Sequence, residues 1–234
     1  MKHLIRDTFI LFVITLVSGA LLGFVNELTK EPIAQYEAER KVIACSEVFK
    51  EEDENGALTE TVSLQFEPAG EEEILVLNNT LKDSFSGNVA VTELYRAYKT
   101  EDMILLENET QPHDSVDQVN EKVLHGYVIG ITTKEGYNGD ISFYVGISED
   151  GKVKGVSLLN IAETPGLGMN AEAVLLPQFR NVDIEQFRVV KTGAKVSNEI
   201  DAISGATVTS DAITEGVNVA GMCYTLLQEG GDAE

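Results

Sequence analysis

The segment VLHGYVIGITTKEGYNGDISFYVGISEDGKVKGVSLLN, residues 123–160, decides the fold. It contains three runs that are rich in Val, Ile and aromatic residues, and Gly-containing turns separate them. The runs are Val123–Thr132, Asp140–Ile147 and Val153–Asn160. Short connections of this kind join neighbouring antiparallel strands. The segment therefore predicts an antiparallel meander.

Further elements are predicted on both sides of the meander. Phe187–Thr192 is another strand candidate, and Thr61–Phe66 is a short one in a loop-rich acidic region. A helix is expected from about Ser210 to Gln228, because apolar residues recur there at steps of three and four. This stripe consists of Ile213, Val217, Ala220, Tyr224 and Leu227. The predicted fold class is α+β, an antiparallel sheet flanked by helices.

The first part of the chain contains an apolar segment. Residues 8–26, TFILFVITLVSGALLGFVN, carry no charge and would span about 28 Å as a helix, enough to cross a membrane. Lys2 and Arg6 precede the segment, so the positive-inside rule predicts a cytoplasmic N-terminus at residues 1–7. A cleaved signal peptide is the alternative. The apolar segment is, however, longer than the usual apolar region of a signal peptide, and no convincing cleavage site follows it.

The residues after the apolar segment are expected outside the cytoplasm. Pro32 stands where a new helix can begin, so residues 27–50 predict a stalk helix. Residues 51–234 then form the extracytoplasmic domain.

Charge and cysteine content exclude several functions. The chain has a formal net charge of −22, which disfavours nucleic acid as a partner. Its acidic runs, such as Glu71-Glu72-Glu73, are typical of solvated faces or loops. Cys45 and Cys223 form no metal-binding pair and are expected to be buried thiols, with a disulfide as the alternative. The three histidines share no ligand spacing, so no metal site is predicted.

The segment before the last helix carries the chemistry. It reads Asp201-Ala202-Ile203-Ser204-Gly205-Ala206-Thr207-Val208-Thr209-Ser210. Thr209, Ser210 and Asp211 are suited to cap the helix, which places Thr207 at a helix N-terminus. Unpaired N–H groups and the positive end of the helix dipole favour a phosphate group there. A plain helix cap is the simpler interpretation of the motif.

The motif resembles the flavinylation motif, S/T-G-A-T after an acidic residue, of the FMN-binding subunits in Rnf and sodium-pumping quinone reductase complexes. The resemblance implies that Thr207 carries FMN through a phosphoester. It also implies a magnesium-dependent flavin transferase that uses FAD as donor. Ser204, Gly205, Ala206, Val208 and Thr209 are then the neighbouring cofactor-binding residues.

Two upstream motifs match the same families. Residues 163–168, Glu163-Thr164-Pro165-Gly166-Leu167-Gly168, match their ETPGLG loop. Residues 136–140, GYNGD, match a GYxGD/E-type turn and contain Tyr137. The loop is expected to hold the flavin ring, with Gly166 and Gly168 permitting close backbone approach. Glu31-Pro32-Ile33-Ala34, just after the apolar segment, also recurs in Rnf G-type subunits, so the resemblance extends over most of the chain.

The resemblance implies an electron-relay subunit with covalently bound FMN in a membrane-bound, ion-translocating ferredoxin:NAD oxidoreductase of the Rnf type. Its partners would be the other membrane subunits and, during maturation, the flavin transferase. No independent substrate turnover and no catalytic residue are expected, because no nucleophile and base are paired around the motif. One alternative is the C-type FMN subunit of the sodium-translocating NADH:quinone reductase. Another is a non-redox, membrane-tethered assembly module.

Overall fold

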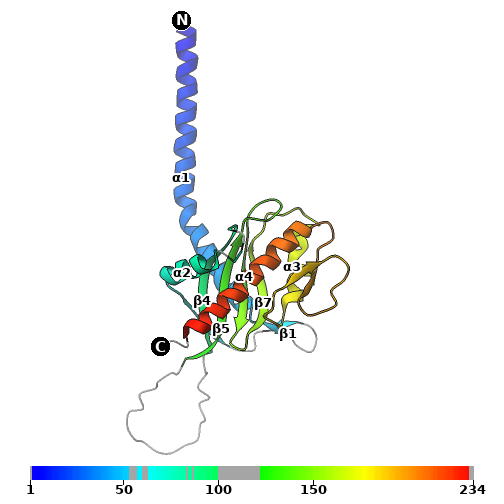
Figure 1. Ribbon diagram of the computed structural model, residues 1–234. Coiled ribbons are helices and arrows are strands. Elements are labelled where there is room, and N and C mark those ends of the chain that lie inside the picture. Colours follow the sequence, from blue (N-terminus) through cyan, green and yellow to red (C-terminus); the bar gives the residue numbers. More distant parts are fainter. Residues whose placement is uncertain are drawn as a thin grey trace, which may run out of the picture. The chain divides into compact units, whose positions relative to one another are not determined.

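A six-stranded sheet forms the centre of the structure (Figure 1). The computed structural model describes residues 2–52, 57–59, 63–82, 84–85, 87–99 and 122–231. In chain order the elements are α1 (Lys2–Glu47), β1 (Glu51–Glu52), β2 (Leu58–Thr59), β3 (Leu64–Pro68), α2 (Glu71–Leu81), β4 (Val89–Lys99), β5 (Val123–Thr133), β6 (Ile141–Ser148), β7 (Lys152–Asn160), η1 (Gly168–Asn170), α3 (Ala171–Val174), η2 (Leu176–Phe179), β8 (Val182–Asp183), β9 (Arg188–Val190), β10 (Glu199–Asp201) and α4 (Thr207–Gly231).

The predicted meander is confirmed as β5, β6 and β7. They lie in the sheet order β3-β4-β5-β6-β7-β8, in which each neighbouring pair is antiparallel. Successive side chains of β6 pack on opposite faces, with Phe143 and Val145 in one core cluster and Tyr144 in the other. A central strand that is buried on both sides needs apolar residues throughout, which explains the near-continuous apolar run of β6.

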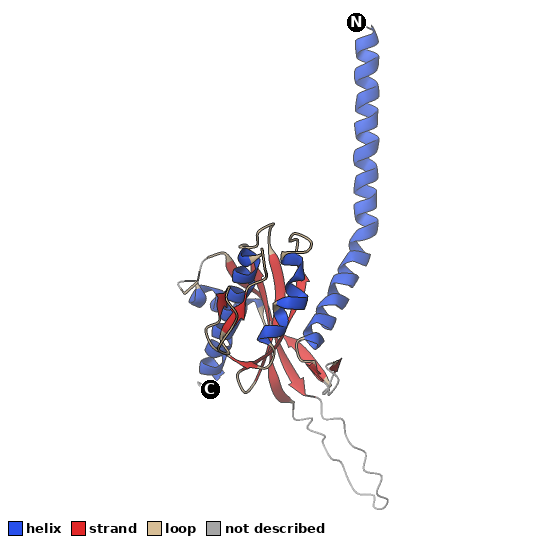
Figure 2. Cartoon of the chain, turned by 90° about the vertical axis from the view of Figure 1, so that its right-hand side faces the viewer, coloured by secondary structure: helices blue, strands red, loops and turns tan. Residues whose placement is uncertain are grey.

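Helix α4 covers the larger core on one face of the sheet (Figure 1 and Figure 2). The predicted stripe is confirmed, since Ile213, Val217 and Ala220 are buried in this core and the last two members pack against it. Gly216 has a packing role, because a Cβ there would lie 2.5 Å from Cζ of Phe143. The glycine that weakens the helical propensity thus permits close helix-to-sheet contact.

The opposite face carries a smaller core around the end of α1. Ala44, Cys45, Val48 and Phe49 pack there with Tyr144. Cβ atoms at Gly146 and Gly155 would lie 2.6 Å and 2.9 Å from atoms of Val48. Small residues on β6 and β7 therefore make the groove in which this end of the helix lies.

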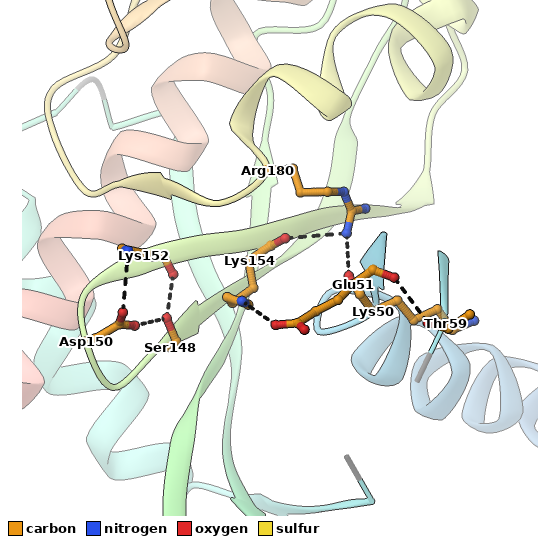
Figure 3. A network of polar contacts seen from close by, with 8 residues as sticks. All are labelled: Lys50, Glu51, Thr59, Ser148, Asp150, Lys152, Lys154 and Arg180. Carbon is orange, nitrogen blue, oxygen red and sulfur yellow. Dashed lines mark hydrogen bonds and ion pairs between the residues drawn. The ribbon is translucent and has the colours of Figure 1, made fainter. Parts of the chain in front are cut away.

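Polar contacts also hold the residues after α1 against the sheet (Figure 3). Arg180, which follows η2, donates from Nη1 to the carbonyl of Lys50 at 2.7 Å. Lys154 on β7 forms an ion pair with Glu51 at 2.8 Å. These contacts hold the segment that follows α1 against the sheet.

The chain divides into two units, Met1–Ile43 and Ala44–Glu234. The first unit contains α1 as far as Ile43, and Arg6–Glu47 is the helix in the described residues that is long and apolar enough to cross a membrane. The expected helix start at Pro32 is not seen, because α1 runs through this proline without a break. One missing backbone hydrogen bond on an exposed helix face is tolerated where the flanking turns are strong helix formers.

Two other expectations need correction. The acidic run Glu71-Glu72-Glu73 is a solvated face, as expected, but it belongs to the first turn of α2 and not to a loop. Negative charge is favourable there at the helix dipole. The last member of the run forms a 2.6 Å ion pair with Arg96. The strand expected at Phe187–Thr192 is shorter, and β9 pairs in parallel with β10 outside the main sheet. Cys45 and Cys223 are buried thiols in the two different cores, as expected, and form no disulfide with each other.

Candidate functional site

A tight turn leads into α4. The N–H of Ala206 donates to the carbonyl of Ile203 at 2.9 Å, and Gly205, the third residue of this turn, has φ of 76°. Hydrogen bonding from the first to the fourth residue with positive φ at the third is the geometry of a type II turn, which favours glycine there. The Ser204-Gly205-Ala206 sequence thus reverses the chain just before the helix.

The helix starts three residues earlier than expected, at Thr207. Ser210 therefore lies in the first turn, where its buried hydroxyl accepts from the N–H of Ile203 at 3.0 Å and donates to the carbonyl of Ala206 at 2.9 Å. Thr209 is only 1% exposed in the same turn. The Ser210 hydroxyl thus locks the turn onto the helix, and Thr207 is half-buried as the first helical residue.

The loop after β7 contains a second turn of the same kind. The N–H of Leu167 donates to the carbonyl of Thr164 at 3.1 Å. Pro165 occupies the second position, and Gly166 has φ of 80° at the third. Proline and glycine at these positions are the preferred residues of a type II turn, so the motif sequence encodes the loop shape directly.

Glu163 connects this loop to the turn between β5 and β6. Its carboxyl oxygen Oε1 accepts from the N–H of Tyr137 at 2.7 Å and from that of Asn138 at 3.4 Å. The side chain of Glu163 is 5% exposed, whereas Tyr137 is 71% exposed. Sequence reasoning missed this contact, because the two residues are 26 positions apart and no spacing rule joins them.

The three motif segments line one hollow of about 570 Å³. Of the residues predicted from the sequence, the lining ones are Tyr137, Glu163, Thr164, Leu167, Gly168, Gly205, Ala206, Thr207, Val208 and Thr209. Ser204, Pro165 and Gly166 do not line it. The structure thus brings together segments that lie up to about seventy residues apart in the chain, while three of the predicted residues shape the turns from outside.

Gly168 is the point of closest packing in the site. A Cβ there would lie 2.7 Å from Cβ of Glu163 and 2.7 Å from Oγ1 of Thr209. A Cβ at Gly166 would meet nothing within 4 Å. Gly168 is therefore the glycine of this loop that lets other side chains pack close to the backbone. The role of Gly166 is to adopt a positive φ.

The hollow suits a flat organic cofactor that bears a phosphate. Its volume is in the usual range for such sites, roughly 300–1,000 Å³. Among the residues that the structure describes, its lining is apolar or hydroxyl-bearing apart from one charged residue, Glu163. The free N–H groups at the start of α4 are suited to bind phosphate, and Leu167 and Val208 offer apolar surface to a ring system.

A second hollow lies at the joint between α1 and β7. It measures about 230 Å³, and Glu47, Ser157 and Arg180 are among its lining residues. Ser157 donates to the carboxylate of Glu47 at 2.9 Å, so its polar groups bond to one another. Within the described ranges, no group of three or more His, Cys, Asp or Glu residues is arranged to hold a metal ion.

Comparison with known proteins gives two family matches. Residues 136–221 match the FMN-binding domain, and residues 1–48 match the RnfG N-terminal region. The first match contains all three segments of the hollow. This match supports FMN as the cofactor of the domain, and the chain carries an N-terminal helix that is long and apolar enough to cross a membrane.

Named relatives agree with these matches. The G subunit of the Na(+)-translocating ferredoxin:NAD(+) oxidoreductase complex of Acetobacterium woodii is 40% identical over 111 residues, 45% of this chain and 54% of that protein. The proton-translocating counterpart of Clostridium ljungdahlii is 41% identical over 95 residues, 40% of this chain and 50% of that protein. The chain spans about half the length of these two relatives. The G subunit of the ion-translocating oxidoreductase complex of Shewanella piezotolerans is 25% identical over 232 residues, 95% of this chain and 90% of that protein.

Among solved structures, the crystal structure of Shewanella oneidensis NqrC matches with a TM-score of 0.42 and 19% identity, over 68% of this chain and 96% of that one. In this chain the match to the RnfG N-terminal region thus precedes the match to the FMN-binding domain.

Proposed function

We propose that this chain is the electron-relay subunit of an Rnf-type, ion-translocating ferredoxin:NAD oxidoreductase, and that it carries FMN as a phosphoester on Thr207. The observation that carries the proposal is the position of Thr207. It is half-buried at the first position of a 25-residue helix and lines the same hollow as the two other motif segments. A phosphate on its hydroxyl would lie at the positive end of the helix dipole, beside free backbone N–H groups.

The bound flavin would supply one- and two-electron exchange, and the protein would hold the ring and set its potential. Leu167 and Val208 would contact the ring, while Gly205 and Ala206 leave space around the Thr207 hydroxyl. A covalent link suits a domain outside the cytoplasm, because the cofactor cannot be lost by dissociation.

Attachment requires a flavin transferase with FAD as donor. The Thr207 oxygen would form the new bond to the FMN phosphorus, the pyrophosphate bond of FAD would break, AMP would leave, and the hydroxyl proton would pass to a base of the transferase. Thr207 is therefore an acceptor during maturation and has no part in turnover.

In-gel flavin fluorescence after denaturation tests the attachment site. Thr207→Ala should abolish the fluorescent band, whereas Ser204→Ala, which removes the neighbouring exposed hydroxyl, should leave a band. Fluorescence that persists in Thr207→Ala would refute the assignment, and loss in Ser204→Ala alone would move it to Ser204.

Membership of a larger complex is supported by the names of the relatives and by the match at residues 1–48. That N-terminal match favours an Rnf-type complex over the sodium-translocating NADH:quinone reductase. Native purification should recover the chain with other membrane subunits that include a ferredoxin- or NAD-linked redox protein. Recovery with a quinone reductase instead would contradict the proposal.

We also propose that the N-terminus faces the cytoplasm and that residues from about 27 onward face the outside. Arg6 and Lys2 precede the apolar segment, as the positive-inside rule requires. Protease added to right-side-out vesicles should cut the domain once partner subunits are dissociated. Cleavage that requires lysis would reverse the orientation.

A further inference from the structure

Glu163 is a buried acid next to the hollow. Its carboxyl oxygen Oε1 has two partners among the described residues, the N–H groups of Tyr137 and Asn138, at 2.7 Å and 3.4 Å. An ionised carboxylate only accepts hydrogen bonds, and both partners are donors. The side chain therefore holds the turn that presents Tyr137 at the rim.

Packing fixes the carboxylate in this position from two sides. A Cβ at Gly136 would lie 2.9 Å from Oε1 of Glu163, and a Cβ at Gly168 would lie 2.7 Å from its Cβ. Both glycines belong to the sequence motifs. Their small size thus gives the Glu163 side chain room, in addition to shaping the turns.

The charge of this carboxylate is not neutralised nearby. Within the part of the chain that the structure describes, no Lys, Arg or His forms an ion pair with Glu163. The side chain is 5% exposed, so solvent screens its field weakly. The other lining residues of the hollow are uncharged.

We propose that Glu163 is a positioning and tuning residue of the flavin site: it holds the Tyr137 turn at the rim and places a negative charge beside the ring, which lowers the flavin's reduction potential. The proposal rests on FMN occupying this hollow. Reduction adds negative charge to the ring, and a fixed negative charge nearby opposes it. Glu163 acts on the ring through its field and through the Tyr137 turn.

The test is a spectroelectrochemical titration of the flavin on the purified full-length chain in detergent. Glu163→Gln keeps a hydrogen-bond acceptor and the side-chain length but removes the charge, so the midpoint potential should shift to more positive values. Glu163→Asp keeps the charge and should shift the potential much less. Glu172→Gln makes the same charge change at an exposed position that does not line the flavin hollow and is the control, with no shift expected.

An unchanged potential in Glu163→Gln would overturn the proposal, as would an equal shift in Glu163→Asp, since shape and not charge would then be responsible. Should the glutamine variant not fold, Glu163→Met, which is also uncharged and similar in length, takes its place under the same criteria. Wild-type chain that loses its flavin on denaturation would refute covalent attachment alone. The potentials would still be measurable on FMN bound without a covalent link.

Discussion

At the scale of single residues, the glycines of the site have different physical roles. Gly166 and Gly205 adopt positive φ in two turns of the same type, whereas Gly168 gives space where the loop meets Glu163 and Thr209. The motif sequence alone suggests one role for all of them, namely close approach to a ring. The distinction depends on contacts between segments and is therefore not visible in the sequence.

This distinction predicts different effects of alanine at two neighbouring positions. Gly168→Ala should force apart Glu163 and Thr209, with a loss of about 1–3 kcal/mol of stability and a changed flavin absorption spectrum. Gly166→Ala should cost about 1–2 kcal/mol through its positive φ and leave the spectrum unchanged. Thermal melting measures the loss of stability in both variants, and their absorption spectra show whether the flavin environment has changed. A spectrum that changes in Gly166→Ala but not in Gly168→Ala would reverse the assignment.

At the scale of elements, α4 joins the core to the site. Its first turn carries Thr207, and its buried stripe packs on the sheet from Ile213 onward. The position of the hydroxyl is thus set by the packing of the whole helix.

A glycine-to-alanine pair in α4 tests this packing. Alanine normally stabilises a helix interior by about 1 kcal/mol relative to glycine. Gly216→Ala should instead destabilise by about 1–3 kcal/mol, because the new Cβ would lie 2.5 Å from Phe143 and 2.9 Å from Ile131. Gly230→Ala meets nothing within 4 Å and is the matched control, expected to be neutral or stabilising. Equal melting temperatures for the two variants would contradict the close contact.

The joint between the end of α1 and the sheet should respond to pH through His125. Its ring packs on Phe49 with centroids 5.4 Å apart. Burial, and then the positive charge of Lys154, lower the pKa of His125 below the ordinary value. Because the folded pKa is the lower one, the unfolded state binds the proton more readily, and this contribution to stability is lost as pH falls below about 6.5.

The melting temperature should therefore fall between about pH 7.5 and about pH 5.5, and His125→Phe, which keeps a ring against Phe49, should reduce that fall. An identical pH dependence in wild type and variant would show that His125 does not contribute.

At the scale of the whole molecule, the sequence was most informative where local chemistry determines structure. The meander and the N-terminal helix followed from the apolar composition of their segments, and the buried stripe of α4 followed from residue periodicity. Both type II turns lie in motifs identified by resemblance. Helix α2 was missed, because an acidic run is equally compatible with a loop and with a first helical turn. The contact between Glu163 and Tyr137 was also missed, since it exists only once the meander has folded.

The charge distribution of the molecule separates the site from the rest of the surface. The chain has a net charge of −22, yet in the described part of the chain Glu163 is the one charged residue that lines the hollow, and it is buried. A phosphate-bearing cofactor would be repelled by the acidic surface at long range. This would be a physical reason for the proposed enzymatic attachment, because a covalent bond does not depend on the equilibrium of free FMN with an acidic protein.

The most direct test of this account is the intact mass of the chain purified from a host that contains the flavin transferase, with peptide fragmentation to locate any addition. The expected result is a mass increase of one FMN less one water, found on the peptide that contains Thr207 and absent from Thr207→Ala. An unmodified mass for chain that has been exposed to an active transferase, or an addition located at another residue, would contradict it.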